Sequence, residues 1–329
     1  MTIISRLSLL IGLLTLSVGQ VSAQQSVNLL GSVCTPAMDQ PVTDPGTDRT
    51  YVLDYPCDLQ AGEPITFILN LHGGGSNTRY QHGYFPAFEY KEKYRLVIAT
   101  PYSPTRRWSE VDDEYLQNII TAVTDAVGQE NVRSFWLAGH SQGGSTSRRL
   151  VCTDFFSERV DGFLSLSGGR LGGSPERSPD AGRPRQVDDP AVDPSLPPPA
   201  RRVALPDPTC DFSHIFAIGE HEIVDLPTSS SWAAKYNCSP RVQGADVVDA
   251  EAGYVHDGGH QNPATKAWGR LPRGGTSQIF AYPGCDDGRV VADVVRIDKG
   301  HTEGLETNVV DEILGMMVTV TSGKIQRGN

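Results

Sequence analysis

Short apolar runs alternate along the chain with longer segments whose apolar residues recur at helical spacing. Continuous short apolar runs are typical of strands that are buried on both faces. Such runs occupy residues 65–71, 95–99, 134–139, 162–167, 214–219, 278–282 and 290–297. Helical patterns lie between or after them, at residues 109–127, 142–152, 229–237 and about 306–319. This alternation predicts an α/β fold with a mostly parallel central sheet and helices on both faces.

The segment 109–127 has the clearest helical pattern. Six of its apolar residues fall on one face: Val111, Tyr115, Leu116, Ile119, Ile120 and Val123. Asp112 and Asp113 lie in the first turn, where the helix dipole favours negative charge. We therefore expect one amphipathic helix over this whole segment.

Two segments interrupt the alternation and are predicted to be irregular insertions. Residues 171–208 contain ten prolines and almost no large apolar side chain, a composition that cannot hold a regular element. Residues 243–276 are rich in glycine and contain His256, His260 and Trp268. Such insertions often cover the ligand-binding cleft of α/β folds. A solvated loop without a role is an equal alternative for the proline-rich segment.

The first residues are typical of a secretory signal peptide. One positive charge precedes an apolar run at residues 7–18, and the small residues Val21 and Ala23 mark a cleavage site after Ala23. The run is short for a bilayer span, so an uncleaved anchor is the weaker interpretation. We expect residues 1–23 to be removed and residues 24–329 to form one extracellular or periplasmic domain.

Composition adds a constraint on partners and one on the redox compartment. The chain has 329 residues, a net charge of −11 and a pI near 5.2. This charge disfavours a nucleic-acid partner, which would need a basic surface. Six cysteines, an even number, suggest disulfides in a secreted protein. None stands in a C-x-x-C pair, so neither a zinc cluster nor a redox motif is expected.

The stretch GHSQG, at residues 139–143, is the strongest sign of chemistry. It matches the motif G-x-S-x-G, with a predicted strand before it and a helical pattern after it. In such an elbow the backbone of the serine is strained, and the glycines let strand and helix pack closely. The serine Oγ is lifted to the carboxyl end of the sheet, near the N–H groups of the helix N-terminus. We therefore predict that Ser141 is a nucleophile; a plain turn is the alternative.

A serine hydroxyl needs a base, and five histidines follow Ser141 in the sequence. His301 is the best candidate, because it lies between the last predicted strand and the last predicted helix. His256 and His260 lie in the second insertion. Their spacing of four would suit a metal ion, but neither a helix nor a third ligand accompanies them. His214 precedes a strand, and we expect it to be structural.

The acid that orients the base is expected in the segment GEHEIVD, directly after the predicted strand at residues 214–219. Its task is to accept a hydrogen bond from the imidazole and hold the correct tautomer. Glu222 is our choice, because it lies on the loop that leaves the strand, and Asp225 is the alternative. Glu220 is interpreted as a solvated loop charge.

Donors for an oxyanion are expected from two places. The run HGGG at residues 72–75 follows a predicted strand, and its glycines let backbone N–H groups approach a reacting carbonyl. We expect the N–H groups of Gly74 and Gln142 to be the donors; a flexible turn is the alternative for the glycine run.

Trp108, near the end of an early strand, is predicted to line the substrate site. A core or rim tryptophan is an equal alternative.

Several pieces of the sequence, taken in order, resemble the secreted esterase family that includes poly(3-hydroxybutyrate) depolymerases and feruloyl esterases. The pieces are LHGGGSN, VDDEYLQNIITAV, GHSQGGSTSRRLVC, YNCSP, YPGCDDGRVV and DKGHTEG. They cover most of residues 51–317 apart from the two insertions. The resemblance implies an α/β-hydrolase fold, no metal and no other cofactor, with Ser141 and His301 as nucleophile and base.

The resemblance also suggests a disulfide between Cys238 and Cys285, and with it the pairs Cys34–Cys57 and Cys152–Cys210. The chain departs from the family in two places. Glu222 stands where the family usually has an aspartate. Thr302 and Glu303 stand where an aromatic residue and a proline often follow the histidine. The second departure bears on the substrate preference.

Together these residues predict a secreted serine esterase that works through an acyl-serine intermediate. The expected substrates are feruloyl or acetyl esters of plant-wall material. An aliphatic polyester or a related synthetic polymer is the alternative, because the same chemistry cleaves both. The partner is then an ester substrate, and neither nucleic acid nor a membrane. Two rivals belong to other classes: a peptidase of the same fold, which would usually need a further gating domain, and a secreted binding protein without activity.

Overall fold

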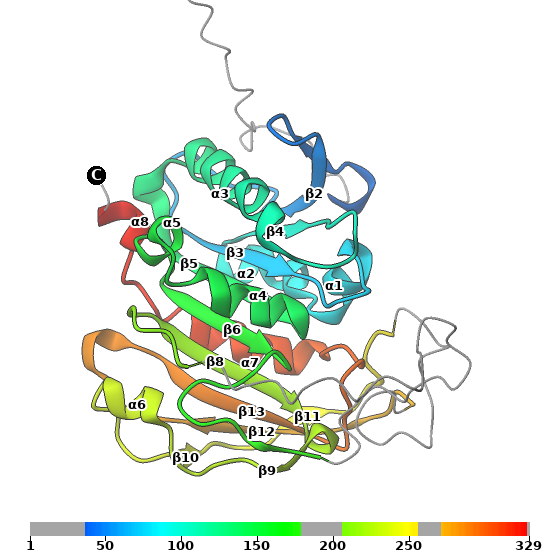
Figure 1. Cartoon of the computed structure of the whole chain (residues 1–329), viewed down its shortest axis with the longest axis vertical. Coiled ribbons are helices and arrows are strands. Elements are labelled where there is room, and N and C mark those ends of the chain that lie inside the picture. Colours follow the sequence, from blue (N-terminus) through cyan, green and yellow to red (C-terminus); the bar gives the residue numbers. More distant parts are fainter. Residues whose placement is uncertain (1–36, 179–205, 256–270, 328–329) are drawn as a thin grey trace, which may run out of the picture.

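The computed structural model describes residues 37–178, 206–255 and 271–327 (Figure 1). Its main feature is an 11-stranded sheet with the order β1-β2-β4-β3-β5-β6-β8-β13-β12-β10, in which β11 also pairs with β12. A separate ribbon joins β7 and β9. The strands are β1 (Val42–Asp44), β2 (Arg49–Asp54), β3 (Ile65–Leu71), β4 (Leu96–Pro101), β5 (Val132–His140), β6 (Gly162–Leu166), β7 (Glu176–Arg177), β8 (Ser213–Gly219), β9 (Ile223–Asp225), β10 (Val242–Gln243), β11 (Val247–Asp249), β12 (Gly275–Ala281) and β13 (Val291–Ile297).

The six central strands β4, β3, β5, β6, β8 and β13 run parallel to one another, whereas β2 and β12 pair antiparallel with the outer two. The chain goes from β3 to β4 on one side and then returns to β5 on the other side of β3. This reversal makes the carboxyl ends of β3 and β5 the topological switch point, where ligands usually bind in open parallel sheets. The topology alone therefore predicts where a functional site belongs.

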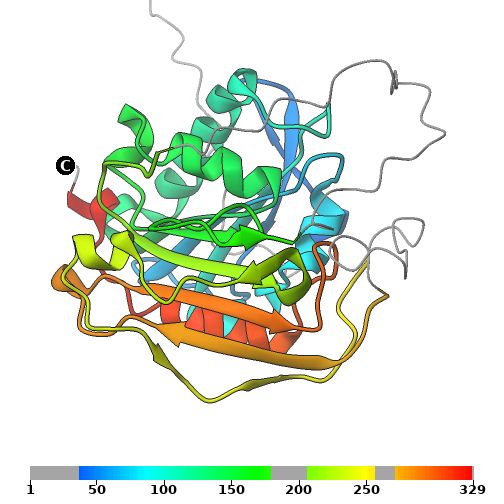
Figure 2. The ribbon, with the colours of Figure 1, turned by 60° about the horizontal axis from the view of Figure 1, so that its bottom comes forward.

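Helices cover both faces of the sheet (Figures 1 and 2). Side chains of α3, α4, α5, α6 and α8 join one buried cluster, and those of α1 and α7 join a second cluster on the other face. The helices are α1 (Thr78–Tyr84), α2 (Lys91–Tyr94), α3 (Asp113–Val127), α4 (Gln142–Leu150), α5 (Asp154–Ser157), α6 (Ser231–Lys235), α7 (Thr307–Met317) and α8 (Lys324–Arg327). Short 3₁₀ turns include η1 (Ala37–Asp39), η2 (Ala87–Tyr90), η3 (Glu110–Asp112), η4 (Gln129–Asn131), η5 (Glu220–Glu222) and η7 (Asp286–Gly288).

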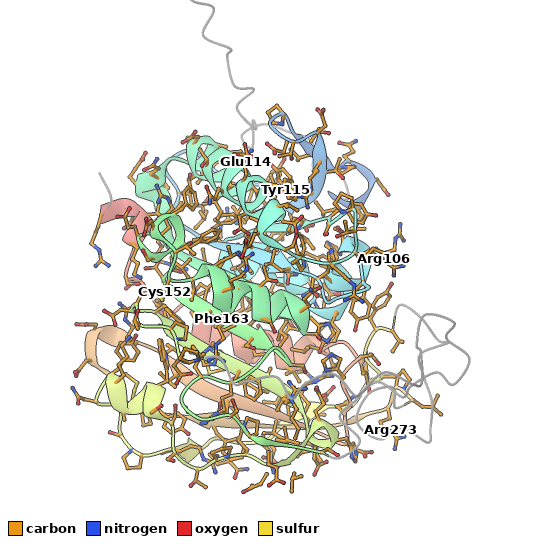
Figure 3. All side chains as sticks on the ribbon, in the orientation of Figure 1. Arg106, Glu114, Tyr115, Cys152, Phe163 and Arg273 are labelled. Atoms are coloured by element: carbon orange, nitrogen blue, oxygen red, sulfur yellow. A yellow bond between two sulfur atoms is a disulfide. The ribbon has the colours of Figure 1, made fainter. Side chains whose placement is uncertain are left out.

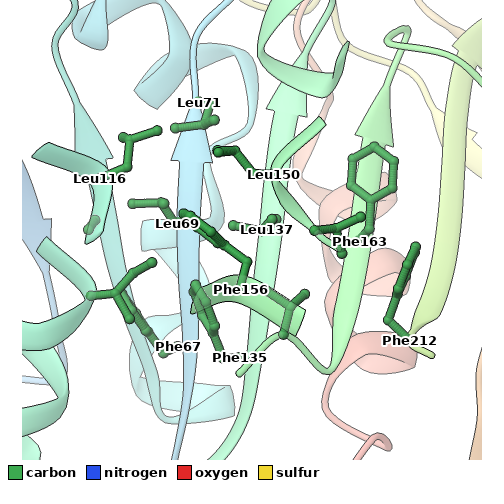
Figure 4. Close-up of a cluster of buried hydrophobic side chains, with 14 of the residues drawn as sticks. Phe67, Leu69, Leu71, Leu116, Phe135, Leu137, Leu150, Phe156, Phe163 and Phe212 are labelled. Carbon is green, nitrogen blue, oxygen red and sulfur yellow. The ribbon is translucent and has the colours of Figure 1, made fainter. Parts of the chain in front are cut away.

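Figure 4 shows part of the first cluster. Phe67 of β3 stacks on Phe135 of β5 with the ring centroids 4.8 Å apart, and Leu150 of α4 belongs to the same cluster. The next residue of each strand, Ile68 and Trp136, belongs to the cluster on the opposite face, because successive strand residues point to opposite sides. Both faces of the central strands are buried, which explains their unbroken apolar runs.

The predicted α/β-hydrolase fold is confirmed, with a mostly parallel sheet between two helical layers. One helix boundary was wrong. The pattern at residues 109–127 gives a helix only from Asp113, because Ser109 caps the separate turn η3. Val111 in that turn is 83% exposed, so it does not belong to the apolar face.

Parts of both predicted insertions are regular. Residues 243–276 were expected to be irregular, but they contain β11 and the first residues of β12, and these pair with each other. The described end of residues 171–208 contains the short strand β7, and Leu171 is buried. The strands β7 and β11 are short and lie at sheet edges, where a few residues leave no periodic pattern to recognise.

Two of the expected disulfides are present, Cys152–Cys210 and Cys238–Cys285. Cys57 is also disulfide-bonded, and Cys34, which we expect to be its partner, lies outside the described residues. The predicted signal peptide at residues 1–23 lies outside them as well. Within residues 37–178, 206–255 and 271–327, each helix is too short or too polar to cross a bilayer.

Candidate active site

Ser141 lies in the sharp turn between β5 and α4. Its backbone has φ 51° and ψ −111°, a conformation that L-residues adopt only when the surroundings enforce it. The Ser141 N–H donates to the carbonyl of Leu166 in β6 over 2.8 Å. This bond ties the turn to the neighbouring strand and holds the serine at the carboxyl edge of the sheet.

Glycines let this turn pack against its neighbours. A Cβ on Gly139 would lie 2.3 Å from the carbonyl carbon of Gly143, and a Cβ on Gly143 would lie 2.3 Å from the carbonyl oxygen of Leu71. Gly144 is also close to a neighbour, since its Cβ would lie 2.8 Å from the Gly168 Cα. All three contacts are with backbone, which cannot turn aside as a side chain can. The glycine spacing therefore follows from the contact of α4 with β3, β5 and the loop after β6.

The glycine loop after β3 lies against the first residue of α4. A Cβ on Gly74 would be 2.9 Å from Gln142 Oε1 and 3.4 Å from Gln142 Cβ, so the two expected oxyanion donors come from adjacent residues in space. The first N–H groups of a helix have no acceptor within the helix. By contrast, the Gly75 N–H donates to the Arg106 carbonyl over 2.7 Å. That bond anchors the far end of the loop.

Trp108 supports this loop from the inside. Its side chain is 5% exposed, and its indole Nε1 donates to the carbonyl of His72 over 2.7 Å. The Trp108 N–H also donates to Gln142 Oε1 over 3.3 Å. Trp108, which we expected to line the substrate site, thus contacts both segments that carry the expected donors. These contacts fit a positioning role.

His72 is held as a neutral imidazole. Its Nε2 accepts from the Ser103 N–H over 3.2 Å, so the proton lies on Nδ1, which donates to the Gly73 carbonyl over 2.8 Å. Burial lowers the pKa of His72 to about 4. The start of the glycine loop is therefore fixed by an uncharged side chain at neutral pH.

Glu222 and His301 form a buried pair. They follow the adjacent parallel strands β8 and β13, in which Gly219 lies beside Arg296. Glu222 Oε2 accepts from His301 Nδ1 over 2.5 Å. Its other oxygen, Oε1, accepts from Ser167 Oγ over 2.6 Å and from the Gly219 N–H over 3.2 Å. Both carboxylate oxygens thus have fixed donors.

The Glu222 carboxylate stays charged although it is buried. Burial alone would raise the pKa of Glu222, but the attraction of His301 and the hydrogen bonds from His301, Ser167 and Gly219 outweigh it, so the pKa is lowered. A permanent negative charge beside Nδ1 keeps the proton on that nitrogen and leaves Nε2 as the basic atom.

The other two acids of this segment lie elsewhere. Asp225 is exposed on β9, where it pairs in register with Glu176 of β7. Glu220 Oε2 accepts from the Asp298 N–H over 2.8 Å. Of the three acids considered from the sequence, Glu222 is the one that contacts His301.

His140, the residue before Ser141, connects the serine turn to the loop that carries His301, which we call the base loop. Its Nε2 donates to the His301 carbonyl over 2.9 Å, and the two rings lie 4.7 Å apart. Burial, and secondarily the charge of His301, lowers the pKa of His140. The hydroxyl of Tyr84 donates to the same carbonyl over 3.4 Å, and that of Tyr80 to the Thr302 carbonyl over 2.8 Å. The base loop is therefore held against the nucleophile turn.

Four buried charges lie behind the base loop: Asp249, Arg296, Lys299 and Glu303. Lys299 Nζ is 2.7 Å from Glu303 Oε1 and 3.4 Å from Asp249 Oδ1, and Arg296 Nε is 3.6 Å from Asp249 Oδ2. Because Asp249 ends β11, this four-charge cluster joins the second predicted insertion to the segment that carries His301. Glu303, one of the residues where the chain departs from the related family, is thus a structural anchor.

Some candidates from the sequence play other parts or lie outside the described residues. His214 is buried, accepts from the Leu171 N–H at Nε2 over 3.2 Å and contacts the Phe163 carbonyl through Nδ1 over 3.1 Å, as a structural residue would. The residues outside the described part are His256, His260 and Trp268.

Sequence reasoning missed Ser167, His140 and the four-charge cluster. Ser167 could have been found, because it directly follows β6, and the residues after parallel strands meet at one edge of the sheet. His140 had a weaker signal, its place inside the G-x-S-x-G motif. The four-charge cluster left no signal in the sequence, because its members are separated by up to 54 positions. They become neighbours only through the pairing of β11, β12 and β13.

Neither a protein-family model nor a curated protein matches the chain. Solved structures do. An acetyl xylan esterase from Aspergillus awamori aligns over 84% of this chain and 98% of its own, at 14% identity and a TM-score of 0.48. Esterase 2 of Thermogutta terrifontis aligns over 55% of this chain and 70% of its own, at 13% identity and a TM-score of 0.33. Est1E from Butyrivibrio proteoclasticus aligns over 38% and 48%, at 18% identity and a TM-score of 0.27.

These identities and TM-scores are too low to transfer a function. What the chain does must therefore be inferred from the geometry of its own residues: a strained serine turn, a buried Glu–His pair against it, and a glycine loop beside the first residue of α4.

Proposed function

We propose that this chain is a secreted serine esterase of the depolymerase and feruloyl esterase family that its motifs resemble. The observation that carries the proposal is the buried Glu222–His301 pair, held by His140 against a serine whose backbone is strained. This combination supplies a nucleophile, a base and an orienting acid from three neighbouring loops.

In the proposed reaction, His301 Nε2 takes the proton of Ser141 as Oγ attacks the ester carbonyl. The N–H groups of Gly74 and Gln142 donate to the oxyanion that forms. His301 then protonates the departing alcohol, which leaves an acyl-serine, and water activated by the same imidazole releases the acid. Glu222 remains ionised throughout and stabilises the imidazolium.

The first test is hydrolysis of 4-nitrophenyl acetate and butyrate. We expect turnover by the wild type and a loss of about a thousandfold or more in kcat for Ser141→Ala, because the nucleophile is removed. Ser157→Ala makes the same change on α5 and is the matched control. Absence of wild-type turnover, or full activity of Ser141→Ala, would contradict the esterase and favour the inactive binding protein.

Amide cleavage separates the esterase from the peptidase. 4-Nitroacetanilide carries the same acyl group as 4-nitrophenyl acetate but an amine leaving group. We expect ester turnover to exceed amide turnover by several orders of magnitude, because an amide carbonyl is less electrophilic than an ester carbonyl and an amine is a poorer leaving group than 4-nitrophenolate. Comparable rates would favour the peptidase.

We propose feruloyl or acetyl esters of plant-wall polysaccharides as the natural substrates, and an aliphatic polyester as the alternative. Two disulfides are compatible with work outside the cell, where such polymers occur. A panel of hydroxycinnamate esters, acetylated xylan and short polyester films would decide between them by the rate of acid release.

A further inference from the structure

A cavity of about 610 Å³ opens beside the glycine loop. It begins two residues beyond Gly75, because Asn77, Thr78 and Arg79 form one wall. Tyr102 and Arg106, from the loop after β4, form another wall. Such a volume is in the usual range for a small-molecule site. The cavity is therefore large enough for a unit of the substrate other than the ester itself.

The cavity is fixed to the expected oxyanion donors through the backbone. Arg106 accepts the Gly75 N–H at its carbonyl over 2.7 Å, and its Nε donates to the Ser76 carbonyl over 3.3 Å. Thr78 Oγ1 donates to the Pro101 carbonyl over 3.0 Å. Both walls are thus tied to each other and to the glycine loop. A group bound in the cavity would be held at a set distance from the reacting carbonyl.

The charge of the cavity is opposite to that of the chain. The chain has a net charge of −11, yet the described residues of the lining include two arginines, Arg79 and Arg106, and no acidic residue. Both arginines are exposed, and within the described part of the chain neither forms an ion pair. The nearby carboxylate of Asp112 is already paired with Arg49 over 2.9 Å. The positive charge of the cavity is therefore available to a ligand.

The view with side chains places Arg106 on the side of the molecule toward which β3 points (Figure 3). That is the side on which Ser141 follows β5. Tyr102 adds an aromatic ring that is 37% exposed, and Thr50 and Asn77 add polar groups. An aromatic face beside arginines suits a ring that carries a carboxylate: the tyrosine packs against the ring, and a guanidinium binds the carboxylate.

From this arrangement we propose that the cavity is a substrate subsite for a carboxylate-bearing sugar, such as a uronic acid unit of an acidic polysaccharide. The inference rests on the proposed esterase function and adds a substrate class to it. The chain would then cleave esters on acidic polysaccharide in preference to neutral polysaccharide, because the two arginines contribute binding energy only when the neighbouring sugar is charged.

The test compares one polymer in two charge states. Acetylated homogalacturonan is used with its carboxylates free and with them methyl-esterified, and acetate release is measured. We expect kcat/KM to be about tenfold higher for the free acid at low ionic strength, the combined effect of two exposed charge pairs. The preference should shrink at high ionic strength, where such pairs are screened.

Substitutions test which residues cause the preference for the free-acid polymer. The double substitution Arg79→Gln and Arg106→Gln is expected to abolish it. Arg107→Gln, which removes an adjacent exposed charge that does not line the cavity, is expected to keep it. Equal rates on the two polymers would overturn the proposal. Equal loss of preference in Arg107→Gln would also overturn it, since the effect would then be one of general charge.

A binding measurement separates the subsite from the reaction. Ser141→Ala is titrated with oligogalacturonate and with its methyl ester by calorimetry, with the two arginine substitutions added in a second protein. We expect tighter binding of the free acid, lost in the second protein. This result would stand even if the wild type failed to hydrolyse any ester, which would refute the proposed function alone. Equal binding of the two oligosaccharides would refute the subsite.

Discussion

Glu222 has a longer side chain than the aspartate that is usual at this place in the family that the motifs resemble, and hydrogen bonds hold both of its carboxylate oxygens. The carboxylate is reached by donors from two neighbouring loops, Ser167 after β6 and His301 after β13. Because these donors lower its pKa, the charge contributes to the stability of the folded chain at neutral pH. That contribution is lost as the pH falls through the lowered pKa.

The role of Glu222 can be tested against that of Asp225. Glu222→Gln removes the charge but keeps the shape, so the tautomer of His301 is no longer fixed, and we expect kcat on 4-nitrophenyl butyrate to fall by about a thousandfold or more. Asp225→Asn is the matched control on the exposed strand β9 and should remain within about twofold of the wild type. A larger loss in Asp225→Asn than in Glu222→Gln would contradict the assignment.

At the scale of elements, the sequence predicts secondary structure correctly where there are long apolar runs or a recognisable motif. The runs in β3, β5 and β8 are buried on both faces, so the fold and its loop order could be predicted. The motif around Ser141 could be read because only glycine tolerates the contact with β3. Edge strands and the four-charge cluster could not be predicted, since they depend on pairing between distant short segments.

The elbow glycines give a prediction at this scale. Gly143→Ala would place a methyl group 2.3 Å from the Leu71 carbonyl oxygen, so α4 must shift and Ser141 with it. We expect a loss of at least about a hundredfold in kcat and a lower Tm. Gly315→Ala in α7 is the control, because its Cβ would meet only the Tyr94 hydroxyl at 3.5 Å. There we expect full activity and a Tm equal to or above that of the wild type. Unchanged activity in Gly143→Ala would contradict the packing argument.

At the scale of the whole molecule, we expect three buried histidines to contribute to the loss of stability in acid. Burial lowers the pKa of His72 to about 4 and that of His214 to about 3, and it lowers the pKa of His140 as well. In the unfolded chain these groups bind protons near their ordinary value of 6.5. At pH values between the ordinary and the lowered pKa, the folded chain therefore binds fewer protons than the unfolded chain. The contribution of these histidines to the free energy of unfolding is complete above their unfolded pKa. It is lost as the pH falls from that value toward their lowered pKa values in the folded chain.

We expect the free energy of unfolding to fall as the pH is lowered from about 7 to about 4, and for His72 the difference over the whole interval between its two pKa values amounts to about 3 kcal/mol. Denaturant titrations at several pH values measure it. His214→Gln replaces one of these histidines by a side chain that does not titrate, so the decline should become shallower whatever its effect at neutral pH. An equally steep decline in this variant would contradict the assignment of the effect to buried histidines.

The Cys152–Cys210 disulfide adds a second covalent connection between the segments that carry the proposed nucleophile and the proposed acid. Cys152 follows the helix that begins after Ser141, and Cys210 precedes the strand that leads to Glu222, so the bond bypasses the 58 positions that separate the two cysteines. Insertions or deletions in the proline-rich part of that segment, which lies beyond β6 and Ser167, would leave this covalent connection in place. In evolutionary terms, the proline-rich segment can change in length and composition while this bond continues to hold α4 beside the strand that leads to Glu222.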